Sequence, residues 1–301
     1  AQKLAGFSLK DADSLRKAIG KKKAGLMAEV KKSFIHGADK LKIVSKEIAE
    51  EIFSWIEKSN RYAFNKSHAV SYAINAYWSA YCKKWRPERF YVTYLNHADR
   101  KPDSQREIKE LIVDAKSCDI EVYPPRLGHW YSEFFFDKNK IYFGLSDIKN
   151  VGKNDCEKLK ELNQKDAEKY SWLDCLINII YKYNINRRST ISMISVGAFN
   201  GPNNTENRKK MLDEFDSWKK LSAREQKYIS ENYTKFKNLY DCIEDMLSNF
   251  KLAANRLEKV AGINYSIKNP FYSLEDSVIS IAQEEEKYLG CSLTCGKTDD
   301  A

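Results

Sequence analysis

Two groups of cationic side chains beside predicted helix ends are the residues of this sequence best suited to bind phosphate. The first group consists of Arg16, on a helix predicted to end at Gly20, and of the three lysines that follow, namely Lys21, Lys22 and Lys23. Adjacent ammonium groups repel one another, so this arrangement favours a polyanion nearby. Stabilisation of the helix C-terminus by cations is the alternative interpretation.

The second group surrounds the predicted start of another helix. Lys66 and His68 stand beside Asn65 and Ser67. A helix N-terminus presents unpaired N–H groups that suit a phosphate, to which Lys66 adds charge and His68 a hydrogen-bond donor. The alternative is that Asn65 or Ser67 only caps the helix, with His68 packed locally.

A third stretch, residues 143–153, has the pattern of a helix-hairpin-helix motif, with apolar residues at 145, 148 and 151. The usual hairpin reads Gly-apolar-Gly. Here Asn150 replaces the first glycine, and Asn tolerates a left-handed backbone better than most residues. The turn points N–H groups at a DNA phosphate and does not read the bases. The residues expected to hold duplex DNA are Lys149, Asn150, Gly152 and Lys153.

Helical patterns dominate the elements that position these groups. Ser8 with Asp11 forms a variant of the capping box, and Ser45 caps a later helix. Apolar side chains recur at helical spacing in three further sets, which predict buried faces: Ile48, Ile52 and Ile56; Tyr77, Tyr81 and Trp85; and, in a helix over 104–117, Ile108, Leu111, Ile112 and Ala115.

The diproline Pro124-Pro125 is the clearest break in the helical pattern. Two strand-like runs, 132–136 and 140–143, follow it and predict a β-hairpin. Helices then continue to about residue 250, and residues 262–275 read as a loop. The fold class is therefore mostly α. A helical domain over 1–122 precedes a helical domain with a small β-hairpin and a helix-hairpin-helix motif over 123–285.

Positive charge is concentrated in the first third of the chain. Residues 1–100 contain 20 Lys and Arg against 10 Asp and Glu, whereas the remainder contains 31 against 32, so the first third accounts for the net charge of +9. A one-sided basic surface attracts polyanions, and counterion release favours nucleic acid.

Cysteine spacing and hydropathy argue against a metal site and a membrane span. Only Cys291 and Cys295 lie close together, and a zinc site needs four well-spaced ligands. Free thiols in a reducing cytoplasm are the favoured interpretation. No apolar run approaches the roughly 18 residues of a membrane span.

In this order, the three stretches resemble the C-family replicative polymerases, the bacterial DNA polymerase III alpha subunits. The family's fingers carry segments like residues 6–23 and 64–68, followed by an apolar-Pro-Pro element and the hairpin. A second, weaker hairpin resembles residues 186–199, and residues 286–290 are similar to the segment before the family's OB domain.

The resemblance implies a cytoplasmic, DNA-directed DNA polymerase with dNTP and primer–template duplex as ligands. Residues 1–122 correspond to the C-terminal fingers, 123–285 to the hairpin domain and 286–301 to the start of a link to an OB-like domain. The residues expected to contact triphosphate or template phosphate are Arg16, Lys21, Lys22, Lys23, Lys66 and His68.

The family's catalytic carboxylates lie in a palm domain N-terminal to this region. We therefore expect no catalytic residue or metal ligand here, Mg²⁺ held by that palm, and no activity of this chain alone. Asp11 and Asp13 are interpreted as capping residues. Palm and N-terminal regions are expected partners, and a sliding clamp is a candidate, although no Gln-containing clamp-binding peptide is found. The alternatives are a stand-alone DNA-binding or scaffold module and an unrelated helical adaptor.

Replacement of Lys21, Lys22 and Lys23 by Ala is expected to weaken DNA or nucleotide binding and to flatten its salt dependence, because each lysine that neutralises a phosphate releases counterions. The measurement is the log–log slope of affinity against salt concentration. An unchanged slope would show that these lysines are not phosphate ligands.

Overall fold

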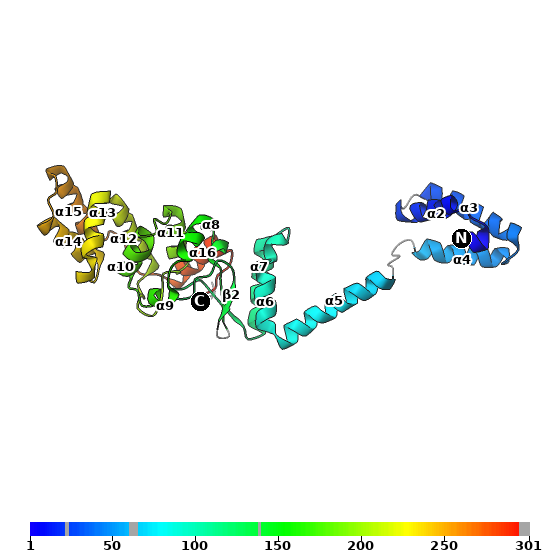
Figure 1. Ribbon diagram of the computed structural model, residues 1–301, viewed down its shortest axis with the longest axis horizontal. Coiled ribbons are helices and arrows are strands. Elements are labelled where there is room, and N and C mark those ends of the chain that lie inside the picture. The colour runs from blue at the N-terminus through cyan, green and yellow to red at the C-terminus, as the bar shows by residue number, and fades with distance from the viewer. Residues whose placement is uncertain (22–23, 60–65, 138–139, 295–301) are drawn as a thin grey trace. The chain divides into compact units, whose positions relative to one another are not determined.

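The structure, a computed structural model, describes residues 1–21, 24–59, 66–137 and 140–294 (Figure 1). It is mostly α-helical, as predicted, with one small three-stranded sheet among the described residues. The chain divides into two compact units, residues 1–78 and 79–301. The predicted functional boundary at 122/123 falls inside the second unit, within a strand. None of the described helices is long and apolar enough to cross a membrane.

The first unit is a small helical bundle. Its helices are α1 (Gln2–Ala5), α2 (Leu9–Lys21), α3 (Ala24–Leu41), α4 (Lys46–Ser59) and the first part of α5 (Lys66–Trp85). Phe34 and Phe53 are fully buried, with ring centroids 5.4 Å apart. A Cβ at Gly37 would lie 2.1 Å from the carbonyl oxygen of Ala5, so only glycine allows α1 to lie this close to α3.

Two local predictions for the first unit are confirmed. Ser8 and Asp11 exchange hydrogen bonds as a capping box, with the Asp11 N–H 3.2 Å from Ser8 Oγ and the Ser8 N–H 3.1 Å from Asp11 Oδ2. The N–H of Ile48 donates to Ser45 Oγ at the start of α4. Gly20, expected to end α2, lies inside it, and the helix continues to Lys21.

The predicted apolar face of α4 is wrong by part of a turn. Ala49 and Phe53 are fully buried and Ile52 and Ile56 partly so, whereas Ile48 is 48% exposed. Residues four apart in an α-helix are offset by about 40°, because a turn takes 3.6 residues. Over the two such steps from Ile48 to Ile56, the predicted row therefore drifts by about 80° around the helix. The face that meets α3 is centred one position later.

The predicted burial of the α5 aromatic stripe is also wrong in the structure. No residue of α5 is buried, and Tyr77, Tyr81 and Trp85 are 68%, 53% and 63% exposed. Helical spacing shows only that the three rings share a face. Burial requires another element to cover that face, and no described helix or strand does so.

The second unit has one apolar core, which extends from Tyr91 to Leu293. Its helices up to the sheet are α6 (Pro87–Leu95), η1 (Ala98–Arg100) and α7 (Ser104–Ser117). Those after the sheet are η2 (Leu145–Asp147), α8 (Lys153–Leu159), α9 (Gln164–Ala167), α10 (Trp172–Cys175), η3 (Leu176–Tyr181), α11 (Arg187–Ser195), α12 (Arg208–Lys220), α13 (Ala223–Asn232), η4 (Tyr233–Lys235), α14 (Leu239–Asn249), α15 (Ala254–Lys268) and α16 (Val278–Leu289).

α7 spans the range predicted for it, and Leu111, Ile112 and Ala115 are buried on one face. The loop predicted over 262–275 is wrong in its first half, since α15 continues to Lys268. Gly262 lies inside α15 with no atom near the place of a Cβ. A single helical glycine costs about 1 kcal/mol relative to alanine, which the packing of Val260 and Ile263 on the core can offset.

The small sheet confirms the predicted β-hairpin and adds a third strand. β2 (Phe135–Asp137) pairs antiparallel with β3 (Lys140–Tyr142). β1 (Glu121–Tyr123) pairs parallel with β3 on the other side, with Val122 opposite Ile141. Both of these residues are buried, so this face of the sheet lies on the core. The chain after β3 therefore enters η2 and the hairpin motif from a fixed position.

Glu214 on α12 is a buried carboxyl whose ionisation opposes folding. It is 4% exposed and accepts a hydrogen bond of 2.9 Å from the indole N–H of Trp172. Burial raises its pKa from 4.5 to about 7. A carboxyl whose pKa is higher in the folded state stabilises that state at low pH, and this contribution is lost as the pH rises through about 7.

Glu214→Gln is expected to raise the Tm at pH 8 and to leave it nearly unchanged at pH 5, because glutamine retains an acceptor for Trp172 and cannot ionise. The expected gain at pH 8 is about 2–4 °C per kcal/mol for a unit of this size. Thermal melts at both pH values measure it, with the exposed Glu231→Gln as the control. An equal shift at both pH values would contradict this assignment.

Candidate nucleic-acid interface

The first predicted phosphate group is only partly described by the structure. Arg16 is an exposed side chain paired with Asp13, with Nη2 and Oδ1 2.8 Å apart. Asp13 also pairs with Lys17, and these hydrogen bonds lower its pKa. Asp13 was expected to cap α2, but it forms ion pairs within the helix instead, because i+3 and i+4 side chains are neighbours there.

Of the three lysines in this group, the structure places only Lys21. Lys21 is the last residue of α2, and Lys22 and Lys23 lie outside the described residues. Their proposed role in binding phosphate stays a prediction.

The second predicted phosphate group lies at the start of α5. Lys66 is the first residue of this helix, and both Lys66 and His68 are exposed. The His68 ring lies edge-on to the ring of Tyr72, with centroids 4.5 Å apart. Asn65 lies outside the described residues, so its role as a cap is not described. A phosphate role for Lys66 and His68 stays a prediction.

The predicted hairpin at residues 148–152 is a tight turn. Asn150 has a φ of 73°, so asparagine takes the left-handed position of the first glycine, as expected. Val151 is buried beneath the turn. Gly152 is extended, with a φ of −86°, and precedes the first residue of α8, Lys153. The left-handed turn thus depends on Asn150 and not on Gly152.

The start of α8 has no side-chain cap, because Gly152 stands at the N-cap. Within the described parts of the chain, the N–H groups of Lys153 and Asn154 have no hydrogen-bond partner. The ammonium groups of Lys149 and Lys153 likewise form no ion pair with any described residue. The turn therefore combines open N–H donors with two unpaired cations.

A second turn of the same geometry precedes α11. Asn184 is left-handed with a φ of 46°, Ile185 is buried, and Asn186 is the extended N-cap. Residues 184–186 thus repeat 150–152 position by position. The second hairpin predicted over 186–199 is displaced. That range contains α11 and its C-terminal turn, whereas the turn equivalent to the first hairpin lies just before it.

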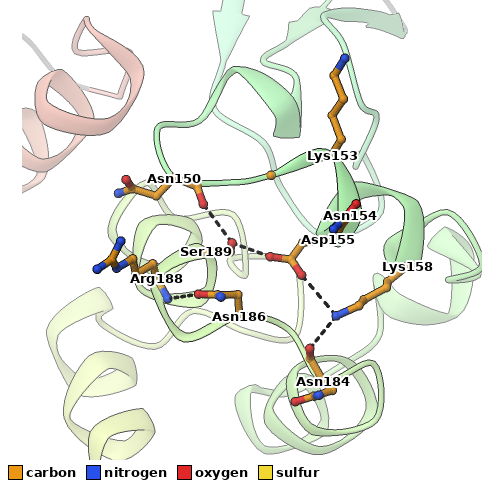
Figure 2. A pocket seen from close by; sticks show the side chains of 10 residues that line it. Asn150, Lys153, Asn154, Asp155, Lys158, Asn184, Asn186, Arg188 and Ser189 are labelled. Atoms are coloured by element: carbon orange, nitrogen blue, oxygen red, sulfur yellow. Dashed lines mark hydrogen bonds and ion pairs between the residues drawn. The ribbon is translucent and has the colours of Figure 1, made fainter.

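Asp155 and Ser189 join the two turns at their centre. Ser189 Oγ lies 2.5 Å from Asp155 Oδ2 and 3.0 Å from the carbonyl oxygen of Asn150 (Figure 2). Asp155 and Ser189 are both buried, with 6% and 2% exposure. They occupy equivalent positions of the two repeats, since each lies five residues after the left-handed asparagine. Contact between equivalent positions is the mark of a local two-fold axis.

Two further contacts obey the same symmetry. Lys158 Nζ donates to the carbonyl oxygen of Asn184 over 2.8 Å, and Asn150 Nδ2 donates to Ser192 Oγ over 3.1 Å. Positions 184, 189 and 192 follow 150, 155 and 158 by the same interval of 34 residues. Each repeat therefore uses its eighth residue after the left-handed asparagine to hold the asparagine of the other.

An open pocket of about 680 Å³ lies between the two turns. Figure 2 shows the hydrogen-bonded network along its floor and the side chain of Lys153 extending away from that network. The lining residues are Asn150, Gly152, Lys153, Asn154, Asp155, Lys158, Asn184, Asn186, Arg188 and Ser189. The only acidic side chain among them is Asp155, which is buried against Ser189 and Lys158, so the open surface is cationic and rich in donors.

α16 supports the first turn from behind. The N–H of Lys149 donates to the carbonyl oxygen of Tyr288 over 2.9 Å. α16 is itself anchored by Glu285, which is fully buried and 3.0 Å from the guanidinium of Arg208. Arg208 also donates to the carbonyl oxygen of Ser195 at the end of α11. The same buried ion pair therefore connects α16 with the second repeat.

Sequence reasoning missed Ser189, Ser192 and Asp155. They are small polar residues inside helices, and neither turn shows the two glycines of the usual hairpin. The available signal was the interval of 34 residues between Asn-Val-Gly-Lys at 150–153 and Asn-Ile-Asn-Arg at 184–187. No group of three His, Cys, Asp or Glu that could hold a metal ion occurs in the part of the chain that the structure describes.

Two family models match the chain. Residues 1–42 match the bacterial DNA polymerase III alpha subunit finger domain, and residues 119–211 match the helix-hairpin-helix motif. The second range contains both turns and the network between them.

Curated relatives named DNA polymerase III subunit alpha are similar over much of the chain. The protein of Aquifex aeolicus is 37% identical over 66% of this chain, that of Borreliella burgdorferi 35% over 72%, and that of Neisseria meningitidis serogroup A 31% over 84%. These matches cover 17%, 18% and 21% of the relatives. The chain thus spans about a fifth of the length of the curated relatives.

Asn150→Ala is expected to lower the free energy of unfolding by about 1 kcal/mol more than Asn150→Gly, because a Cβ is strained at positive φ. Both variants lose the amide contact with Ser192, so their difference isolates the backbone. Urea denaturation measures it. At Asn154, in the first turn of α8, Asn154→Gly should instead be less stable than Asn154→Ala, because glycine has the lower helix propensity. Equal stabilities of the two Asn150 variants would argue against the left-handed turn.

Proposed function

Since the chain belongs, over its finger and helix-hairpin-helix regions, to the bacterial DNA polymerase III alpha subunits, we propose that its paired turns hold the backbone of duplex DNA during primer extension. One observation carries this proposal. Open N–H donors and the unpaired Lys149 and Lys153 surround a turn whose backbone is fixed by hydrogen bonds to α11 and α16. Such a surface binds phosphate oxygens and reads no base, which suits an enzyme that must move along any sequence.

The turn binds without first having to order itself. The carbonyl of Asn150 faces Ser189, its amide faces Ser192, and the N–H of Lys149 is held by α16. Because this backbone is fixed before DNA arrives, little conformational entropy is lost on binding. When Lys149 and Lys153 neutralise phosphates, the counterions condensed on the DNA are released. We therefore expect the affinity for DNA to fall steeply as the salt concentration rises.

The finger region is proposed to hold the triphosphate of the incoming dNTP. The exposed cations Arg16 and Lys66 and the lysines at 21–23 are proposed to neutralise the charge of the transferring phosphate and the leaving pyrophosphate, with His68 as a hydrogen-bond donor. Mg²⁺ and its carboxylates are proposed to come from a palm region. Asp11 and Asp13 do not fit that role, since Asp11 caps α2 and Asp13 pairs with Arg16 and Lys17.

Replacement of Lys149 and Lys153 by Ala is expected to weaken binding of a short duplex roughly tenfold or more and to lower the salt slope by about 1.8. Fluorescence anisotropy measures both. Lys227→Ala with Lys235→Ala is the matched control, because it removes the same charge from α13 and η4. Loss of affinity of similar size in the control would mean that only net charge matters.

Primer extension with dNTPs and Mg²⁺ tests the polymerase assignment. We expect no extension by this chain alone and extension when it is mixed with a palm fragment of a related alpha subunit, since in-line phosphoryl transfer needs metal-binding carboxylates. Extension by the chain alone would disprove the proposed dependence on a palm. Duplex binding without extension, both by the chain alone and in the mixture with the palm fragment, would favour a stand-alone DNA-binding module.

A further inference from the structure

We infer that the two symmetric turns divide the work: the turn at 150–152 binds a DNA phosphate, whereas the turn at 184–186 is closed by its own Asn186 side chain and serves as a scaffold for the first. This inference rests on the proposed DNA binding. It makes Asn186 the residue that sets how many phosphates the repeat pair binds.

The repeats differ at the N-cap. Asn186 Oδ1 accepts a hydrogen bond of 2.8 Å from the N–H of Arg188 (Figure 2). In the first repeat the equivalent N–H is that of Asn154, and the equivalent N-cap is Gly152, which has no side chain to accept it. The donor that a phosphate oxygen would use is therefore already occupied in the second repeat and open in the first.

The repeats also differ at the next residue, independently of the cap. Arg187 occupies the place of Lys153, but its Nη2 lies 2.8 Å from Asp216 Oδ1 on α12. Lys153 forms no ion pair with any residue described in the structure. Arg187 does not line the pocket between the turns, whereas Lys153 does. Both differences reduce anion binding by the second repeat.

The side chains of the second repeat point to a supporting role. Ser189 and Ser192 contact the carbonyl and the amide of Asn150. In the other direction, Lys158 of the first repeat donates a hydrogen bond to the carbonyl oxygen of Asn184. Arg188 remains in the pocket, where its guanidinium adds positive charge, while its N–H is used by the cap.

Equivalent charge removals in the full chain test this division. Lys153→Gln and Arg187→Gln each remove one cation from the same position of a repeat. The log–log salt slope of binding to a short duplex, measured between about 50 and 200 mM salt, should fall by about 0.9 for Lys153→Gln and stay unchanged for Arg187→Gln. Equal falls would overturn the division and leave the proposed DNA binding intact. No fall in either variant would overturn both.

Opening the second turn is the complementary test. Asn186→Gly recreates the N-cap of the first repeat and should raise the slope by up to about 0.9, with three- to tenfold tighter binding at low salt. Asn186→Ser keeps a capping oxygen and should match the unchanged protein. Melting curves of both variants verify folding. A slope in Asn186→Gly equal to that of Asn186→Ser would show that the cap does not exclude phosphate.

Discussion

The buried hydrogen bond between Asp155 and Ser189 is the constraint on which the interface depends. It joins equivalent positions of two repeats and lies where almost no water reaches it. A buried carboxylate without its partners is strongly destabilising, so the two helices that carry these side chains cannot separate or slide. The positions of the two turns are therefore fixed relative to each other. Ser189 also donates to the carbonyl oxygen of Asn150, which fixes the backbone of the first turn.

A second buried pair extends this rigidity to the end of the chain that the structure describes. Arg208 and Glu285 connect the C-terminal end of α11 with α16, and Glu285 also accepts the N–H groups of Leu293 and Thr294. α16 in turn holds the first turn through the carbonyl of Tyr288. The residues expected to lead toward a further domain thus also support the hairpin. A displacement of α16 would reach the first turn directly through the hydrogen bond between Tyr288 and Lys149.

Local rules predicted the elements that local interactions decide. The Ser8–Asp11 box, the cap at Ser45, the range of α7 and the pairing of β2 with β3 all depend on residues close in sequence. The left-handed Asn150 follows from the same rules, because its backbone preference is intrinsic. The predicted contacts of Arg16, Lys66 and His68 with phosphate depend instead on a ligand, and no local pattern decides them.

The mostly helical fold, the first hairpin and its replacement of glycine by asparagine follow from the order of the residues, because each of these is set within a few positions. Tertiary contacts establish which face of α4 is buried, that β1 joins the sheet, and that 150–152 and 184–186 form one symmetric unit. These depend on contacts between residues 19 to 42 positions apart in the chain. The 34-residue interval between the two turns is visible in the sequence, but it does not show that the turns are in contact, since the energy of such contacts comes from burial that exists only once both segments have folded.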